Sequence, residues 1–316
     1  MISVISPIYN EEANLLTLYQ RIKNVLTDLV EEDHEIILVD NGSTDGSLKI
    51  IKQLRDNDMK VKYISLSRNF GHQSGILAGI EHARGDAVIS IDGDLQQPPE
   101  LIAEMVKLWK SGFQVVYTIK TSRSYKFSFR QIFTSLFYKL LSRISDLKLS
   151  HGQSDFRLLD REIVDVLKNM PERNKFLRGL VEWVGFKQTY LEYNPSDRLH
   201  GESKFSFKHY INFALDGIVS FSTLPLRLVL LFGVGVACLS FVYVVNLLIT
   251  WAMSLWDLNV ELPPGWATIA VSISFLGGVQ LISIGLVGEY ISRIFAQTKK
   301  RPEYIIREIN ITNSSD

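Results

Sequence analysis

Two long runs without a charged residue lie in the last third of the chain and restrict its fold more than any other feature. Leu228 to Trp256 and Leu262 to Gly288 contain 29 and 27 consecutive uncharged residues. A helix needs roughly 20 apolar residues to cross the hydrocarbon core of a bilayer. Both runs exceed the length of most helices in soluble cores, so we expect two transmembrane helices, with a buried helical hairpin as the alternative.

The charges around the two runs predict their orientation. The connector contains Asp257 and Glu261 but no Lys or Arg. Basic residues flank the outer ends of the runs, at Lys204, Lys208 and Arg227 before the first and at Arg293, Lys299, Lys300 and Arg301 after the second. By the positive-inside rule, both flanks are cytoplasmic and the connector is external. Aromatic and small residues fit this arrangement: Trp251, Trp256 and Trp266 at the outer interface, and Gly277, Gly278, Gly285 and Gly288 on a face suited to helix contact.

Two further segments have the pattern of helices that lie in the plane of a membrane. Apolar residues recur at helical spacing from Phe129 to Ile144, with Lys139 and Arg143 elsewhere on the helix. A second segment, Phe207 to Phe221, directly precedes the first uncharged run. Basic amphipathic helices beside membrane spans commonly lie among the lipid headgroups, so we expect both segments to be interfacial. Packing onto the soluble domain is the alternative for each.

Strand and helix patterns alternate from the first residues to about Tyr117. Strand patterns occur at Ile2–Ser6, Glu35–Val39, Val61–Ser65, Ala87–Ile91 and Gln114–Tyr117, and helical patterns at Glu12–Leu29, Asp45–Arg55, Gln73–Ala83 and Pro99–Trp109. This alternation predicts an α/β domain with a Rossmann-like, mostly parallel sheet covered by helices on both faces.

The run Ile91 to Glu100 places two aspartates, Asp92 and Asp94, directly after a buried strand pattern. Open α/β sheets bind ligands at the carboxyl ends of their strands. Carboxylate oxygens suit Mg²⁺ or Mn²⁺, which usually keep phosphate oxygens as further ligands. Polar clusters also follow the three earlier strands, at residues 7–12, 40–46 and 67–71. Each cluster alone is typical of a turn, but four at successive strand ends favour one shared pocket.

Several classes of protein lose support from the sequence. The 34 basic residues balance the 34 acidic ones, so nothing indicates a nucleic-acid partner. Neither the dinucleotide glycine pattern nor the P-loop pattern is present. The single cysteine, Cys238, permits no disulfide within the chain, which fits a reducing compartment. The chain opens on a strand pattern, so we expect no cleaved signal peptide.

At this point a family resemblance is evident. The order Pro-x-Tyr-Asn-Glu, Val-Asp-x-Gly-Ser-Thr-Asp, Ser-Arg-Asn-Phe-Gly, Asp-Gly-Asp-Leu-Gln and Asp-Phe-Arg-Leu-Leu-Asp-Arg resembles family 2 glycosyltransferases of the GT-A fold. More closely, the chain resembles polyprenyl-phosphate glycosyltransferases, which include dolichol-phosphate mannose synthases and bactoprenol glucosyltransferases. The bactoprenol enzymes share the later features, namely Arg198 with Gly201 to Lys204, the paired spans, and Gly288 to Arg293 followed by Arg301-Pro302.

The resemblance implies a role for each motif. Pro7, Tyr9, Glu11 and Asp40 match the nucleoside pocket. Asp92, Asp94 and Gln96 match the metal and diphosphate ligands. Asp155 and Arg157 match positions beside the sugar and acceptor, with Asp94 counted among the catalytic residues. Arg123, Arg198 and Lys204 match basic positions near the phosphates. The chain departs from the pattern twice, because Asn41 stands where many relatives have a second Asp and His72 where a lysine is frequent.

The implied reaction moves a hexose from UDP to undecaprenyl phosphate with inversion, using Mg²⁺ or Mn²⁺. The resemblance favours glucose; mannose, galactose, N-acetylglucosamine and aminoarabinose stay open. A phosphate monoester has a second pKa of about 6, so the acceptor needs little activation. We therefore expect Asp155 to position the acceptor or Arg157, with a general base as the second reading and a structural cap or ion pair as the third.

Rival functions predict features that this sequence lacks. A processive polysaccharide synthase carries Gln-x-x-Arg-Trp, which is absent. A flippase predicts polar or charged residues inside the membrane, and the two runs contain no Asp, Glu, Lys, Arg or His, with Cys238 as their one cysteine. A non-catalytic scaffold does not explain an intact Asp-Gly-Asp-Leu-Gln.

The expected organisation is a cytoplasmic GT-A domain (1–205), an interfacial helix (206–223), two spans (224–256 and 265–292) around an external loop (257–264), and a cytoplasmic tail (293–316). The expected location is the bacterial inner membrane. Relatives suggest a homotetramer, and we expect the tail from Lys299 to be ordered only by a neighbouring chain.

Overall fold

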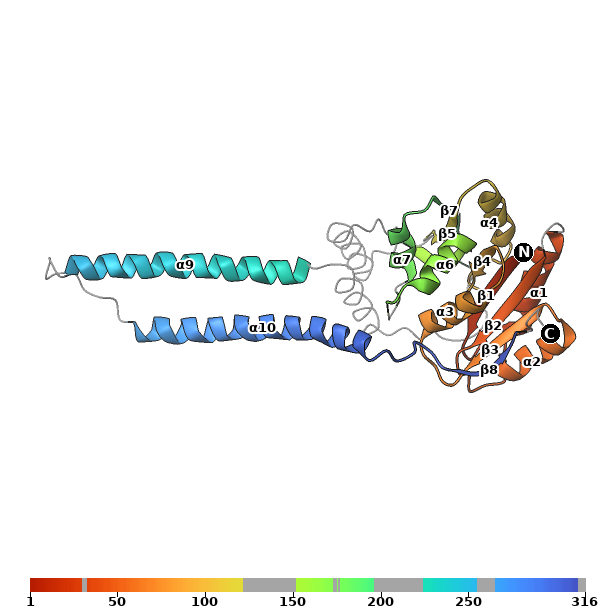
Figure 1. The fold of residues 1–316 in the computed structure, drawn as a ribbon, viewed down its shortest axis with the longest axis horizontal. Coiled ribbons are helices and arrows are strands. Elements are labelled where there is room, and N and C mark those ends of the chain that lie inside the picture. Colours follow the sequence, from red (N-terminus) through yellow and green to blue (C-terminus); the bar gives the residue numbers. More distant parts are fainter. Residues whose placement is uncertain are drawn as a thin grey trace. The chain divides into compact units, whose positions relative to one another are not determined.

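A computed structural model describes residues 1–29, 33–121, 152–172, 175, 177–195, 224–254 and 265–311 of the 316-residue chain (Figure 1). These residues fall into two compact units. One unit comprises Met1–Gly217 together with Arg301–Asp316, and the other comprises Ile218–Lys300. The segments predicted to lie at the membrane interface, 129–144 and 207–221, lie outside the described residues. Their predicted role stays a prediction.

The described part of the first unit contains an eight-stranded sheet in the order β7-β5-β6-β4-β1-β2-β3-β8. The strands are β1 (Ile2–Ile8), β2 (His34–Asp40), β3 (Val61–Leu66), β4 (Ala87–Ser90), β5 (Val115–Lys120), β6 (Gln153–Asp160), β7 (Gln188–Tyr193) and β8 (Ile306–Asn310). The strands β4, β1, β2 and β3 are parallel neighbours, as the alternating pattern predicts. Their carboxyl ends therefore share one edge of the sheet.

The other half of the sheet departs from a simple parallel order. Strand β6 lies between β4 and β5 and is antiparallel to both, while β7 is parallel to β5. The sequence patterns predicted neither β6 nor β7. Strand β6 combines apolar residues with the buried polar residues Asp155 and Arg157, so it lacks the apolar run typical of a buried strand. The sheet is nevertheless mostly parallel, with four parallel pairings against three antiparallel ones.

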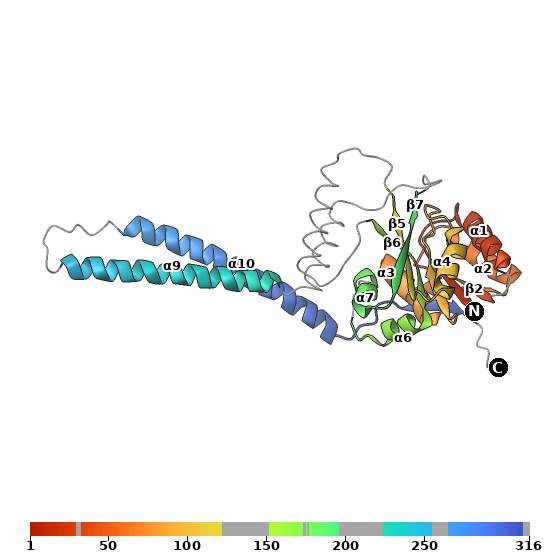
Figure 2. The same cartoon turned by 90° about the horizontal axis from the view of Figure 1, so that it is seen from above.

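Helices cover both faces of this sheet (Figure 2). On one face, helix α1 (Leu15–Asp28) contacts both α2 (Ser47–Asn57) and α4 (Leu101–Lys110). Helices α3 (His72–His82), α6 (Arg161–Asn169) and α7 (Leu177–Val184) form a connected group on the other. Helix α1 shows why they pack there, because Leu15, Leu18, Ile22 and Leu26 are buried at helical spacing.

The C-terminal segment contributes a strand to the sheet of the first unit. Strand β8 pairs antiparallel with β3, with Ile309 opposite Ile64. Glu308 accepts hydrogen bonds from Lys52 (2.7 Å) and from the hydroxyl of Tyr63 (2.5 Å). The Tyr304 hydroxyl donates to Glu81 of α3. The prediction of a tail ordered only by a neighbouring chain is therefore wrong, because β3 of the same chain offers a free sheet edge that β8 completes.

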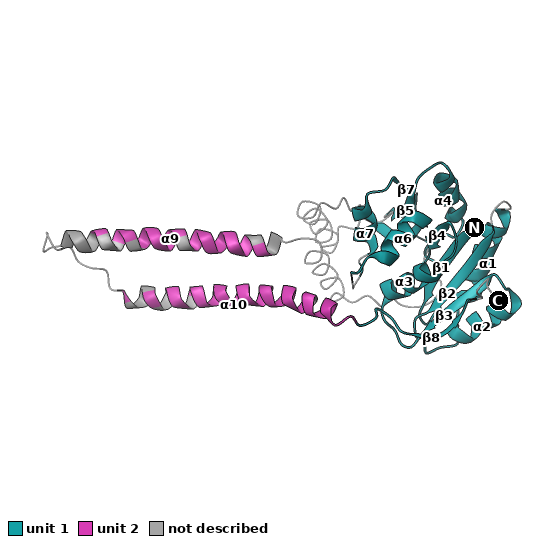
Figure 3. Cartoon of the chain, in the orientation of Figure 1, with its two compact units in different colours: residues 1–217, 301–316 teal, residues 218–300 magenta. Residues whose placement is uncertain are grey.

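The second unit contains two long helices, α9 (Leu224–Ser254) and α10 (Trp266–Thr298) (Figure 3). Apolar side chains on both helices are exposed, for example Leu230 at 67% and Leu281 at 72%. Among the described residues, the stretch Phe275–Thr298 of α10 is long and apolar enough to cross a membrane, and Leu228–Tyr243 of α9 is a shorter apolar stretch. The structure thus contains an apolar helical hairpin where two spans are predicted.

Candidate active site

A tight loop after β4 presents the two aspartates predicted as metal ligands. The backbone N–H of Gln96 donates to Oδ1 of Asp94 at 3.1 Å. Leu95 between them has a φ of +59° although its side chain is 2% exposed. A left-handed backbone is costly for a bulky residue and persists only where its surroundings hold it. The loop is therefore a fixed turn that presents Asp92 and Asp94 at the edge of the sheet.

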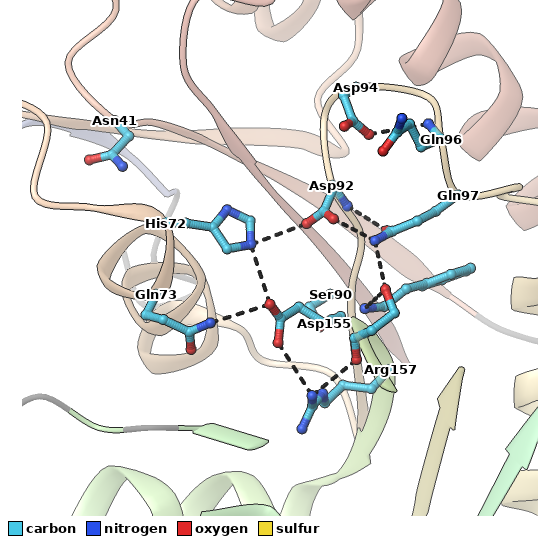
Figure 4. A network of polar contacts seen from close by, with 12 residues as sticks. Asn41, His72, Gln73, Ser90, Asp92, Asp94, Gln96, Gln97, Asp155 and Arg157 are labelled. Carbon is cyan, nitrogen blue, oxygen red and sulfur yellow. Dashed lines mark hydrogen bonds and ion pairs between the residues drawn. The ribbon is translucent and has the colours of Figure 1, made fainter. Parts of the chain in front are cut away.

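Gln97 closes this loop from inside (Figure 4). Its Oε1 accepts the backbone N–H of Asp92 at 2.8 Å, and its Nε2 donates to Oδ2 of the same aspartate. The same Nε2 also lies 2.9 Å from the hydroxyl oxygen of Ser154 on β6. Gln97 is 1% exposed, whereas the neighbouring Gln96, the residue predicted to bind metal, is half-buried.

Asp155 on β6 is the centre of a group of cations. The Arg178 guanidinium of α7 binds both its oxygens, with Nε 2.8 Å from Oδ1 and Nη2 2.7 Å from Oδ2. Arg157 lies 3.3 Å from Oδ1, and the Gln73 amide donates to Oδ2 at 3.3 Å. Burial would raise the pKa of Asp155, but Arg178 and Arg157 outweigh it and hold that pKa well below its usual range. Asp155 is thus a permanent carboxylate that orients arginines.

Arg157 is the more deeply buried of the two arginines, at 3% exposure. Its Nη2 donates to the backbone oxygen of Ser154 at 3.0 Å, while its buried Nη1 has no hydrogen-bond partner within the described residues. Burial lowers the pKa of Arg157 to about 10, and the nearby Asp155 opposes this effect. Arg157 therefore remains a cation at neutral pH.

His72 joins the two carboxylate centres. Its Nε2 lies 3.2 Å from Oδ1 of Asp92 and 3.7 Å from Oδ2 of Asp155 (Figure 4). The carboxylate of Asp92, with that of Asp155 behind it, raises the pKa of His72 to about 9. His72 is thus a cation at neutral pH, at the position where the family resemblance predicts a lysine. The sequence alone marked His72 only as a departure from the family pattern.

The predicted nucleoside pocket lies along the same edge, after β1 and β2. Asp40 is 1% exposed and holds its own turn, accepting the Ser43 N–H at 3.0 Å and the Ser65 hydroxyl at 2.9 Å. Gly42 in this turn has a φ of +71°, and a Cβ there would lie 2.5 Å from the backbone of Arg68. Only glycine fits such an approach.

Asn41 connects this turn to the loop after β3. Its Nδ2 donates to the Gly71 carbonyl oxygen at 2.9 Å, and its Oδ1 accepts the Phe70 N–H at 3.0 Å. An aspartate would keep the second bond and lose the first, because a carboxylate cannot donate. Asn41, which departs from the family pattern, thus makes a hydrogen bond that an aspartate at this position could not make.

The remaining predicted residues divide into those described and those not. Pro7 is buried in β1, and Tyr9 and Glu11 follow that strand half-buried. The Glu11 N–H donates to the Ser47 hydroxyl at 3.0 Å, and its Oε2 accepts the Asn14 amide at 2.7 Å. Arg123, Arg198 and Lys204 lie outside the described residues. The structure brings Asp92 and Asp155 together through His72, and it adds Gln97 and Arg178, which sequence reasoning missed.

The loop can be tested as a Mg²⁺ or Mn²⁺ site by the chemistry of its donors. Asp92 and Asp94 offer hard carboxylate oxygens at the end of one strand, which these cations prefer. Both aspartates are half-buried rather than sealed inside the protein. Among the described residues, no three His, Cys, Asp or Glu side chains form a metal cluster. The residues fit a cation that takes its further ligands from a phosphate-bearing substrate, as Mg²⁺ commonly does.

Comparisons with known proteins identify this arrangement. Residues 3–167 match the model of glycosyl transferase family 2, and residues 224–294 match the model described as the GtrB C-terminal hairpin. The chain therefore belongs to glycosyl transferase family 2, with a GT-A type domain, and is a glycosyltransferase.

Two relatives are similar along almost the whole chain. An uncharacterised glycosyltransferase of Synechocystis sp. is 41% identical over 98% of this chain and 95% of its own length. The bactoprenol glucosyl transferase of Shigella phage SfX is 40% identical over 97% of this chain and 98% of its own. The crystal structure of a Mycobacterium tuberculosis glucosyl-3-phosphoglycerate synthase with Mn²⁺, UDP and glucosyl-3-phosphoglycerate has 20% identity and a TM-score of 0.46, covering 69% and 77% of the two chains.

Proposed function

We propose that this glycosyltransferase moves a hexose, glucose by its resemblance to the bactoprenol enzymes, from UDP to undecaprenyl phosphate. The observation that carries the proposal is the approach of the Asp92–Asp94 loop to the Asp155–Arg157 strand, bridged by His72. A diphosphate held at the Asp92–Asp94 loop and a phosphate acceptor approaching Asp155 and Arg157 would meet at this edge of the sheet. The full-length similarity to bactoprenol glucosyl transferases supports the lipid acceptor.

The proposed chemistry is a single displacement at the anomeric carbon. An oxygen of the acceptor phosphate forms a bond to this carbon while the bond to the diphosphate oxygen breaks. UDP leaves with the electron pair, so an α-linked donor gives a β-linked product. No proton has to be removed, because a phosphate monoester has a second pKa of about 6 and is mostly dianionic at neutral pH.

The protein's own residues would stabilise charge on both sides of the reacting carbon. Asp92 and Asp94, with Gln96 as the third predicted ligand, would hold Mg²⁺ or Mn²⁺, which supplies Lewis-acid neutralisation of the leaving diphosphate. Arg157 and Arg178 are oriented cations next to this point, and preorganised charge of this kind lowers the barrier without reorganisation. Asp155 keeps both in place, and its lowered pKa makes it a weak base, which supports positioning over a general-base role.

The chain's path supports a membrane hairpin with both ends on one side. Strands β1–β7 precede α9, whereas β8 follows α10, and all eight belong to one sheet. A sheet cannot be divided by a bilayer, so the hairpin has an even number of crossings or none. Together with the basic flanks, this supports two spans with a cytoplasmic catalytic domain and an external connector. The bacterial inner membrane and a homotetramer remain predictions from the resemblance.

The test is transfer of radiolabelled sugar from a panel of UDP- and GDP-sugars to undecaprenyl phosphate, with and without EDTA. We expect a chloroform-soluble product from one donor, lost in EDTA and restored by Mn²⁺ or Mg²⁺. Asp92→Ala should abolish the product. No product from any donor, with Asp92→Ala indistinguishable from the unmodified protein, would refute the proposal and favour a scaffold or flippase.

A further inference from the structure

The inner side of the Asp92 loop carries a residue to which no function has yet been assigned. Gln97 is 1% exposed and follows Gln96, the residue that the family resemblance places on the metal. A buried carboxamide is expensive unless its polar atoms are satisfied. Here Oε1 accepts the Asp92 N–H and Nε2 donates to Asp92 Oδ2 and to Ser154 Oγ. The side chain is thus fully committed to two partners.

These contacts fix the orientation of one carboxylate. Backbone and side chain of Asp92 are both bound to the same amide, so the carboxylate cannot rotate without breaking a bond to Gln97. Oδ2 faces Gln97, and Oδ1 faces His72 at 3.2 Å (Figure 4). Carboxylates that bind metals are usually held by such outer hydrogen bonds, and loss of the partner weakens metal binding.

The third contact reaches the other half of the site. Ser154 lies next to Asp155 on β6, and its hydroxyl oxygen also accepts the Tyr193 hydroxyl at 3.3 Å. Tyr193 is 5% exposed on β7. A continuous chain of hydrogen bonds therefore runs from the metal loop through Gln97 to β6 and β7. It fixes the loop relative to the strand that carries Asp155 and Arg157.

We propose that Gln97 is a positioning residue that orients Asp92 for the divalent cation and connects the metal loop to β6. This inference rests on the proposed function, because it assumes that the Asp92 loop binds Mg²⁺ or Mn²⁺. It assigns different tasks to two adjacent glutamines. Gln96 would bind the cation, and Gln97 holds the carboxylate of Asp92 that binds the same cation. The left-handed Leu95 is the turn that brings the Gln97 side chain back under Asp92.

The test is a titration of the full-length protein in detergent with Mn²⁺ in the presence of saturating UDP. The electron paramagnetic resonance signal of free Mn²⁺ measures how much of the ion is bound. Gln97→Met keeps the length of the side chain and removes its donor and acceptor. We expect Gln97→Met to weaken Mn²⁺ affinity roughly 10- to 100-fold, the usual effect of losing an outer hydrogen bond to a metal ligand. The thermal unfolding midpoint of each variant in EDTA is measured alongside.

Two variants separate positioning from general destabilisation. Gln188→Met removes a half-buried carboxamide on β7 that donates to the Val181 carbonyl oxygen at 3.2 Å, away from the loop, and should leave Mn²⁺ affinity unchanged. Ser154→Ala keeps the Gln97–Asp92 pair and removes the contact with β6, so it should weaken Mn²⁺ binding less than Gln97→Met does. If Ser154→Ala bound Mn²⁺ with the same affinity as the unmodified protein, the proposed connection to β6 would be refuted.

The outcomes distinguish this inference from the proposed function. Equal Mn²⁺ affinity of Gln97→Met and the unmodified protein, or an equal loss in Gln188→Met, would overturn the role of Gln97 alone. An unmodified protein that binds no Mn²⁺ with UDP would overturn the metal site itself, and with it both proposals.

Discussion

Arg178 binds Asp155 through two hydrogen bonds, from Nε at 2.8 Å and from Nη2 at 2.7 Å, although the residues lie on different elements of the fold. Asp155 is almost fully buried, and Arg178 is 23% exposed. Paired bonds of this kind are strong and directional. The pair therefore determines where the end of β6 presents its charges to the substrate.

Arg178→Ala should reduce turnover strongly. Arg178→Ala removes the paired partner of a buried carboxylate and leaves it only the more distant Arg157 and His72, at a cost of up to about 3 kcal/mol of folding free energy, and misplacing site groups lowers kcat roughly 100-fold. Arg21→Ala is the matched control, because Arg21 binds Glu100 in the same paired way (2.9 and 2.7 Å) on the surface. Steady-state kinetics and thermal unfolding check both. Equal effects of the two substitutions would contradict a special role for Arg178.

Asp155→Asn should lower kcat/KM without changing the shape of the pH–rate profile on its acidic side. The cations around Asp155 hold its pKa far below its usual range, so it does not titrate where the enzyme is assayed. The measurement is kcat/KM against pH for both proteins. An acidic limb that is present in the unmodified enzyme and missing in Asp155→Asn would identify Asp155 as a general base after all.

Asn41→Asp should weaken UDP binding and lower the unfolding temperature. The new carboxylate would face the Gly71 carbonyl oxygen, where the amide now donates at 2.9 Å, at a cost of about 1–3 kcal/mol. Asn69→Asp is the control, because its Oδ1 only accepts the Gly71 N–H at 2.8 Å and a carboxylate can do the same. Calorimetric UDP titration compares the two. If only Asn69→Asp lost UDP affinity, and Asn41→Asp kept it, this explanation of Asn41 would be refuted.

Acid should remove the stabilisation provided by Asp58. Burial would raise the pKa of this carboxyl, but hydrogen bonds from Lys23 (2.8 Å) and Tyr19 (2.7 Å) lower it to about 2. Because the folded pKa lies below the unfolded value of about 4, the contribution is complete above pH 4 and disappears as the pH falls towards 2. Asp58→Asn should therefore cost about 1 kcal/mol at pH 7 and about half as much near pH 3. Thermal unfolding at both pH values measures the difference, and an equal cost at both would exclude the charge as its cause.

Glu308→Ala should destabilise the first unit, whereas Arg307→Ala should not. Glu308 binds the exposed Lys52 and the buried Tyr63, so its removal breaks an ion pair and takes an acceptor from the Tyr63 hydroxyl, at a cost of about 1 kcal/mol. The exposed Arg307 alternates with it on the same strand. Limited proteolysis and the unfolding midpoint compare the variants. Equal stability of both would show that β8 gains nothing from these contacts.

The sequence predicted the part of the fold that consists of regular apolar strands. Strands β1 to β5 were each located within a few residues, because short apolar runs alternate there with amphipathic helices. Strand β8 was not predicted. Its five residues contain only two isoleucines, Ile306 and Ile309, among polar residues, and such a short segment beyond a long helix resembles a free tail. Its partner β3 lies about 240 positions earlier in the chain, and only the folded chain brings the two together.

The candidate site was predicted where its chemistry lies in one contiguous motif. Asp92 and Asp94 come from one loop, and the Asp-Phe-Arg motif supplied Asp155 and Arg157. Arg178 could not be predicted, because a single arginine in an amphipathic helix is typical of a solvent-exposed position. Gln97 could have been noticed as a polar residue directly before Pro98, but nothing in its position tells which of two adjacent glutamines points inwards.

The late arrival of β8 has a consequence for biosynthesis. During translation, β3 emerges early, and the strand that pairs with its edge follows only after some 240 further residues, including α9 and α10, have been made. An exposed sheet edge is a template for pairing with other chains. A ribosome that stops before residue 306 would therefore release a product with an open edge, suited to aggregation or to recognition by quality control. Pairing of β8 with β3 thus marks a chain that has been synthesised through both helices.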